Sequence, residues 1–186
     1  GTASTVAPWS TGFDSGSVSG LNLSGLDPQS TGAAKIENGR LVFARKPSTG
    51  SLAWTLAWGQ GVYSLSDRMI FRSEVSTDAS QNNNYLLMSL RRVGGAENEG
   101  IHINNGQLYS YRGPNGSEQM QSLGALAAGT TYVVEMETSA TGIVTYVYVK
   151  GQGRDSGFSF SRTVDAASFG NFQLLMHGRS DAGVTG

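Results

Sequence analysis

The fold is decided by the stretch Gly100-Ile-His-Ile-Asn-Asn-Gly-Gln-Leu-Tyr-Ser-Tyr-Arg112. Its central dipeptide, Asn105-Gly106, is one that the two-residue type I′ turn of a β-hairpin favours. Successive side chains of an extended strand point to opposite faces, so each arm has two faces. One face receives Ile101, Ile103, Leu108 and Ser110, and the other receives His102, Asn104, Tyr109 and Tyr111. The stretch therefore predicts a hairpin with one apolar face and one face of aromatic and polar groups.

Similar strand-like runs, separated by Gly, Asn and Ser clusters, extend along the chain in both directions. They lie at Arg40–Ala44, Leu52–Trp58, Met69–Val75, Tyr85–Arg92, Gly100–Asn104, Gln107–Arg112, Thr131–Thr138, Ile143–Lys150, Gly157–Arg162 and Asn171–His177. No window has a sustained helical period, although residues 124–129 and 164–168 each suit one short helical turn. About ten strands in one chain predict an all-β fold, a two-sheet antiparallel sandwich forming a single domain over residues 1–186.

Composition restricts the classes of function. The chain carries 13 Lys and Arg against 14 Asp and Glu, a formal net charge of -1, and no run of either sign, which disfavours nucleic acid as a partner. It has no cysteine, which removes disulfides and thiolate chemistry, and no apolar stretch long enough to insert into a membrane. Low charge and 26 glycines are typical of secreted bacterial β-proteins. We therefore expect a secreted or cell-surface location, with any export signal already removed.

Three segments resemble the concanavalin A-like lectin and glucanase superfamily, in particular laminin-G-like jelly rolls and the carbohydrate-binding modules of bacterial secreted proteins. They are the opening Gly12–Gly16, the hairpin at residues 100–109, and the pair Tyr132–Glu137 with Thr145–Lys150. The resemblance implies a jelly-roll sandwich and a polysaccharide or other glycan as partner. It also matches Asp14 to an acidic position and implies a structural calcium ion, for which carboxylate and carbonyl oxygens are the preferred ligands.

The carboxyl-terminal end departs from this family pattern. Such folds finish with a strand that pairs beside the amino-terminal strand, whereas this sequence ends with Asp181-Ala-Gly-Val-Thr-Gly186. Either the last strand is trimmed or it comes from elsewhere, and a sheet without it has an open edge. We therefore also expect that copies of the chain can assemble through that edge.

Two aromatic groups are candidates for sugar binding, because aromatic faces pack on the apolar side of a pyranose while amides, Arg and carboxylates bind its hydroxyls. Trp54 and Trp58 share one strand face, near Tyr63, and are read either as a binding platform or as part of the core. The second group lies at the end of one hairpin and comprises Tyr109, Tyr111, Arg112 and Asn115, with His102 of the same hairpin as a further candidate.

Candidates for catalysis are fewer. Glu135 and Glu137 have the i, i+2 spacing that places two carboxylates on one strand face, as glycoside hydrolysis requires, but no third acid follows them. Arg72, with His102 and Tyr109, supplies the residue types of a polysaccharide lyase, provided that they converge on one sheet. For each set the alternative is an ordinary ion pair or exposed side chains on an outer face.

These observations favour a noncatalytic carbohydrate-binding, lectin-like module. Two alternatives stay open: a structural or adhesive subunit of a surface filament, layer or matrix, and a glycoside hydrolase or lyase that cleaves polysaccharides.

Overall fold

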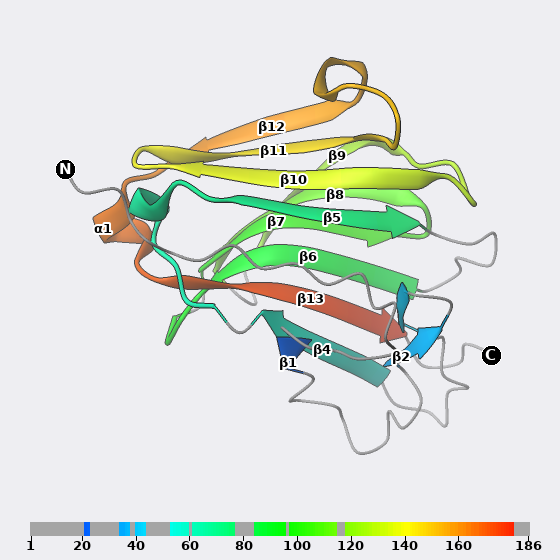
Figure 1. Cartoon of the computed structure of the whole chain (residues 1–186), viewed down its shortest axis with the longest axis horizontal. Coiled ribbons are helices and arrows are strands. Elements are labelled where there is room, and N and C mark those ends of the chain that lie inside the picture. The colour runs from blue at the N-terminus through cyan, green and yellow to red at the C-terminus, as the bar shows by residue number, and fades with distance from the viewer. Residues whose placement is uncertain are drawn as a thin grey trace.

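The computed structural model describes residues 21–22, 34–37, 40–43, 53–59, 61–76, 84–95, 97–114 and 118–180. Side chains are described within 61–76, 86–95, 97–114 and 118–178. In these parts the chain forms two facing antiparallel sheets, with short helical turns at their ends (Figure 1). No helix in the described ranges is long and apolar enough to cross a membrane.

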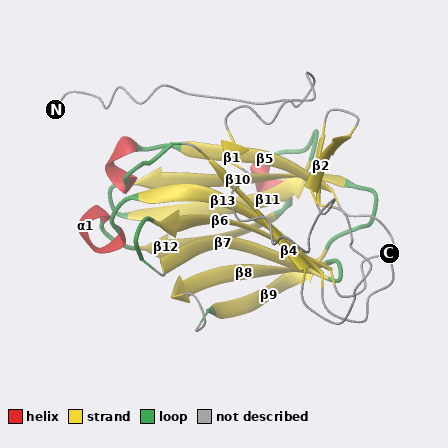
Figure 2. Ribbon diagram, turned by 90° about the horizontal axis from the view of Figure 1, so that it is seen from below, coloured by secondary structure: helices red, strands yellow, loops and turns green. Residues whose placement is uncertain are grey.

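The larger sheet has seven strands, which run side by side in the order β1-β4-β13-β6-β7-β8-β9. Their bounds are β1 Leu21–Asn22, β4 Ala53–Gly59, β13 Phe172–Ser180, β6 Asn84–Arg92, β7 Glu97–Asn104, β8 Gln107–Pro114 and β9 Gln119–Ala125. Figure 2 shows β13, β6, β7, β8 and β9 as neighbours in this order.

The smaller sheet has four strands in the order β12-β11-β10-β5, and a separate pair is formed by β2 and β3. Their bounds are β12 Phe158–Thr163, β11 Gly142–Val149, β10 Thr131–Ser139, β5 Ile70–Ser76, β2 Ala34–Glu37 and β3 Arg40–Phe43. The helical turns are η2 Leu65–Asp67, η3 Arg154–Ser156 and α1 Ala166–Phe169. The chain passes from the larger sheet to the smaller one at β5, back at β6, over again at β10 and back at β13. This repeated crossing is the jelly-roll arrangement predicted from the sequence.

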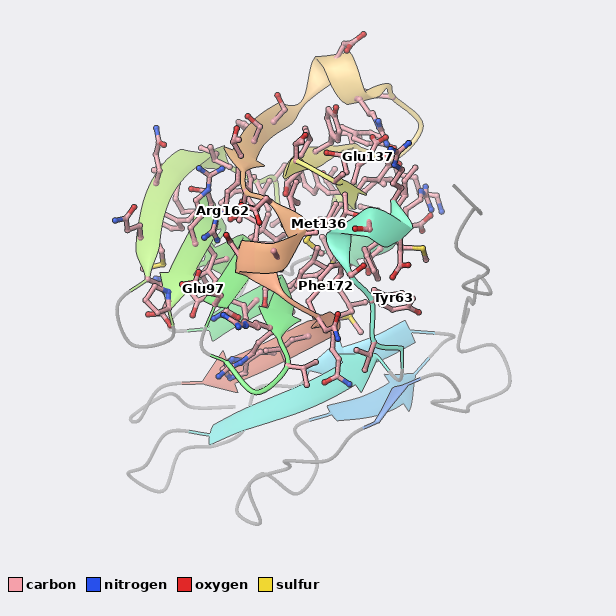
Figure 3. All side chains as sticks on the ribbon, turned by 90° about the vertical axis from the view of Figure 1, so that its left-hand side faces the viewer. Tyr63, Glu97, Met136, Glu137, Arg162 and Phe172 are labelled. Carbon is pink, nitrogen blue, oxygen red and sulfur yellow. The ribbon has the colours of Figure 1, made fainter. Side chains whose placement is uncertain are left out.

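The core lies between the two sheets and follows from strand alternation. The inner face of β10 buries Val134 and Met136, and the inner face of β7 buries Ile101 and Ile103. Figure 3 shows Tyr63, Met136 and Phe172 in the space between the sheets. At one end the rings pack edge to face, with centroids 5.2 Å apart for Tyr63 and Phe71 and 5.7 Å apart for Phe169 and Phe172. Such contacts add about 0.5–1.5 kcal/mol per pair to the gain from burial.

The hairpin at residues 100–112 is confirmed, including its turn. Asn105 and Gly106 both have positive φ, 50° and 74°, as a type I′ turn requires, and register pairs His102 with Tyr109. Every other strand predicted from the sequence is also present, with bounds that differ by a few residues.

One local prediction was wrong, and one strand was not predicted. Residues 124–129 contain no helical turn, because the chain is still in β9 as far as Ala125. Strand β9 itself was missed because its side chains are mostly exposed and polar, so it lacks an alternating apolar pattern. The turn predicted over 164–168 is confirmed as α1, in which the Asp165 side chain accepts a hydrogen bond from Ser168 N (2.8 Å).

The prediction of an open carboxyl-terminal edge rests on residues 181–186, which lie outside the described residues, so it stays a prediction. Strand β13 is the last strand described and lies in the interior of the larger sheet, paired with β4 on one side and β6 on the other. Within the described residues, the last strand therefore pairs with β4, from the amino-terminal half of the chain, and not with β1. The sequence alone could not place it because this pairing joins segments far apart along the chain.

Replacing Ile101 by Ala should lower the free energy of unfolding by about 2–5 kcal/mol, because the side chain is fully buried between the sheets and leaves a cavity. Val93→Ala is the matched control, since Val93 is 46% exposed, and should change it by less than about 0.5 kcal/mol. Denaturant melts of the two variants and the parent chain measure both effects. Equal effects would contradict this placement of the core.

Candidate functional site

The aromatic side of the β7–β8 hairpin is the candidate binding site. His102, Tyr109 and Tyr111 all lie on the outer face of the seven-stranded sheet and are half-buried. The His102 ring centroid is 6.1 Å from that of Tyr109 and 6.0 Å from that of Tyr111, the latter at an interplanar angle of 84°. The structure thus brings together three of the predicted ligand-binding residues, with their rings directed away from the core.

Polar groups surround these rings. Gln107 Nε2 donates to Ser122 Oγ (2.9 Å), one strand further toward the sheet edge. Asn104 Oδ1 is buried and makes no hydrogen bond within the described part of the chain. Amides next to aromatic faces are the combination that binds hydroxyl-rich ligands. The sequence pattern indicates the rings and Asn104 but not Ser122, because Ser122 lies in β9, which lacks an alternating apolar pattern.

Two contacts hold the rings in place. His102 Nδ1 lies 3.0 Å from Met120 Sδ, and Tyr111 donates a hydrogen bond to Glu118 Oε1 at 2.6 Å. Burial, together with the Glu118 carboxylate, raises the pKa of the Tyr111 hydroxyl, so it stays protonated and keeps donating this bond. The rings therefore form a fixed surface, which lowers the entropy lost when a ligand binds.

Next to Tyr111 the sheet has a position without a side chain. Register places Gly100 between Ser89 and Tyr111. A Cβ on Gly100 would come within 2.0 Å of the Met88 carbonyl oxygen, so only glycine fits.

Of the residues predicted to act with Tyr109 and Tyr111, Asn115 lies outside the described residues, and Arg112 lies on the opposite face of β8. It points between the sheets, where its Nε is 3.2 Å from Glu99 Oε1 and its Nη2 donates to the Ser161 carbonyl (2.5 Å). The alternation of β8 separates it from the aromatic site.

Of the other predicted aromatic group, Tyr63 belongs to the core, where it is 4% exposed and packs on Phe71 and Phe172. Trp54 and Trp58 lie in β4, and register pairs them with Arg179 and Leu175, but their side chains lie outside the described residues. Asp14, the predicted calcium ligand, also lies outside them. No group of three or more potential metal ligands occurs in the described ranges, and a calcium ion remains a prediction.

Glu135 and Glu137 lie on the outer face of the four-stranded sheet, where one arginine binds both. Arg154 contacts Glu135 Oε2 at 2.7 and 2.6 Å and Glu137 Oε2 at 2.8 Å. Tyr148 donates to Glu135 Oε1 (2.5 Å), and the guanidinium carbon stands 4.3 Å from the centroid of the Tyr146 ring. Burial raises the pKa of Glu135, but the bonds from Tyr148 and Arg154 outweigh it and hold that pKa below its usual value. Glu135 and Glu137 thus form an ion cluster with Arg154, in which Glu135 stays ionised.

Arg72 lies beside this cluster and not beside His102. Its Nε is 3.6 Å from Glu135 Oε1, and its Nη1 donates to Glu74 (3.3 Å). Arg72 and the pair His102 and Tyr109 therefore belong to different sheets. The structure does not bring together the residue set considered for a lyase.

Arg154→Gln should lower the free energy of unfolding by about 1–2 kcal/mol at neutral pH, because it removes charge-assisted bonds from a carboxylate that is 7% exposed. The folded-state pKa of Glu135 is depressed, so the stabilisation is present above its unfolded pKa and fades as pH falls through the folded value. The difference between variant and parent should accordingly shrink in acid. Lys150→Gln, at an exposed pair with Glu74, is the control and should cost less than about 0.5 kcal/mol. A difference that persists unchanged at low pH would contradict this role.

No protein-family model matches the sequence, and no curated protein matches it. Among solved structures, it is similar to a glycoside hydrolase family protein from Mycobacterium thermorestibile, with TM-score 0.57, 12% identity and coverage of 81% of this chain and 70% of that one. A β-1,3-glucanase from Mycobacterium marinum gives TM-score 0.50, 11% identity and coverage of 82% and 64%, so this chain spans just under two thirds of its length. The carbohydrate-binding module CBM66 from Bacillus subtilis gives TM-score 0.49, 8% identity and coverage of 74% and 81%. At such identities the likeness is one of fold, and the fold of this chain is the concanavalin A-like jelly roll.

Proposed function

We propose that this domain is a noncatalytic carbohydrate-binding module, and that it holds a polysaccharide on the outer face of the β7–β8 hairpin. The observation that carries the proposal is the fixed, half-exposed group of His102, Tyr109 and Tyr111. The rings offer apolar faces to a pyranose, and the neighbouring Gln107 amide and Ser122 hydroxyl offer partners to its hydroxyls.

The fold adds support of a general kind. Proteins with the same jelly roll include a β-1,3-glucanase, which makes a β-1,3-glucan the first polysaccharide to test. A secreted or cell-surface location, where such polymers occur, belongs to the same proposal.

Cleavage at Glu135 and Glu137 has less support. A glycoside hydrolase needs one carboxyl group that keeps its proton, and Arg154 contacts both carboxylates here. Assembly through an open edge is not proposed, because it rests on residues 181–186, which lie outside the described residues.

Tyr109→Ala should weaken binding to a β-1,3-glucan such as laminarin by about tenfold, because a lost aromatic contact of about 1.4 kcal/mol has that effect. Affinity electrophoresis in gels that contain the polysaccharide measures the change, with other neutral glucans and mannans run in parallel. Tyr146→Ala, a half-buried tyrosine on the outer face of the other sheet, is the matched control and should bind like the parent chain.

Three results would contradict the proposal: no retardation by any neutral polysaccharide, equal weakening in Tyr146→Ala, or release of new reducing ends from the bound polymer. The last would indicate an enzyme and would be followed by Glu135→Gln.

A further inference from the structure

A cavity of about 320 Å³ lies at the edge of the sandwich, on the inner side of the seven-stranded sheet. Among the described residues it is lined by Glu97, Arg112, Gly113, Pro114, Gln119 and Arg162. Its volume is within the range of small-molecule sites. Figure 3 shows Glu97, from β7, and Arg162, from β12, extending toward each other across the gap between the sheets.

The two arginines of this cavity differ in how fully they are bonded. Arg162 Nη1 donates to the Asn98 carbonyl (3.2 Å) and to Glu99 Oε2 (3.4 Å), and its Nη2 donates to Glu97 Oε2 (3.1 Å). Its guanidinium also lies over the Phe169 ring, 5.7 Å from the centroid. Arg162 thus joins the two sheets and has little capacity left for a ligand.

Arg112 is bonded less well. Its Nη2 donates to the Ser161 carbonyl, and the guanidinium lies 5.2 Å from the centroid of Phe160. Its Nε forms an ion pair with Glu99 Oε1 at 3.2 Å, but neither of these two buried atoms makes a hydrogen bond of good geometry among the described residues. A guanidinium has five N–H donors in a planar fork, and the Nη1 group of Arg112 also makes no hydrogen bond in the described part. At the Arg112 side of the cavity there are therefore more hydrogen-bond donors than acceptors.

The charge of the cluster depends on Glu99. With Glu99 ionised, two carboxylates balance the two arginines; with Glu99 protonated, the cluster has one positive charge in excess. The Glu99 side chain is fully buried, and this burial, opposed by Arg112 and Arg162, raises its pKa to about 7. Glu97, on the same strand, is the other carboxylate of the cluster and is bound to Arg162. At neutral pH a large part of the molecules therefore carries the excess positive charge.

We propose that this cavity binds the carboxylate group of a small organic anion, held by Arg112 and the Gln119 amide, and that binding is coupled to protonation of Glu99. A ligand carboxylate would accept the bonds that Arg112 does not make. An ionised Glu99 competes for the same guanidinium and repels the ligand, so the ligand favours the protonated form. This inference is independent of the proposed function, because Arg112 and Tyr111 lie on opposite faces of β8.

Amide chemical shifts of the isotope-labelled chain should follow the binding of three probes: D-glucuronate, acetate and D-glucose. We expect saturable shifts at Gly113 and Gln119 with glucuronate and none with its neutral counterpart, glucose. If acetate binds as well as glucuronate, the cavity recognises the carboxylate alone. If acetate binds more weakly, the cavity also recognises the sugar ring, and its ligand is an acidic sugar. Equal binding of glucose, or no binding of either carboxylate at millimolar concentrations, would overturn the proposal.

The coupling is tested with the parent chain, so it needs no variant that must fold. Glucuronate should bind about fivefold or more tightly at about pH 6 than at about pH 8, because Glu99 is protonated in more of the molecules at the lower pH. The carboxylate of glucuronate is ionised at both values, so its own titration does not contribute. Glu99→Gln should remove most of this pH dependence, since glutamine mimics the protonated acid. An affinity that does not change with pH in the parent chain would refute the coupling.

Arg112→Gln should weaken glucuronate binding about tenfold or more while leaving retardation by a neutral polysaccharide unchanged. Arg72→Gln, an exposed arginine on the outer face of the other sheet, is the matched control. Tyr109→Ala should leave glucuronate binding unaltered, so failure of this inference and failure of the proposed function are distinguishable. Equal effects of Arg112→Gln and Arg72→Gln would show that the cavity is not the binding site.

Discussion

Burial of one face of each sheet against the other is the constraint on which the rest of this structure depends. Side chains alternate along a strand, so once Ile101 and Ile103 are fixed in the core, His102 must point outward. The same constraint holds Tyr109 and Tyr111 on the outer face, because Leu108 lies between the sheets. The candidate site is therefore a consequence of core packing, and its aromatic rings need no loop to position them.

The constraint divides the polar groups among three separate surfaces. The outer face of the smaller sheet holds charges that neutralise one another, around Arg154 and Glu135. The outer face of the larger sheet, at the β7–β8 hairpin, holds rings and amides. The edge between the sheets holds a buried group with incomplete bonding, around Glu99 and Arg112. The net charge of the sequence is close to zero and does not reveal this division, because a net charge is the sum over all three surfaces.

Much of the fold was predictable because it is local. The Asn105-Gly106 turn and the alternation on each side of it decide the hairpin without reference to any other segment. The place of β13 between β4 and β6 was not predictable in this way, since long-range pairing depends on the whole sheet. Arg112 marks a different limit: the alternation rule that placed Tyr109 and Tyr111 outside also places Arg112 inside. Grouping it with them by closeness in sequence ignored that rule.

Glu99 shows where the core and the functional surfaces meet. Inner-face positions of β7 are acidic at Glu97 and Glu99, where the strand begins, and apolar further along at Ile101 and Ile103. A buried ion pair is weak support for stability, because removing two charges from water costs about as much as their attraction returns. Here the geometry is also imperfect, since Glu99 Oε1 and Arg112 Nε approach without a hydrogen bond. Stability therefore does not explain the cluster, whereas a ligand that completes the bonding of Arg112 does.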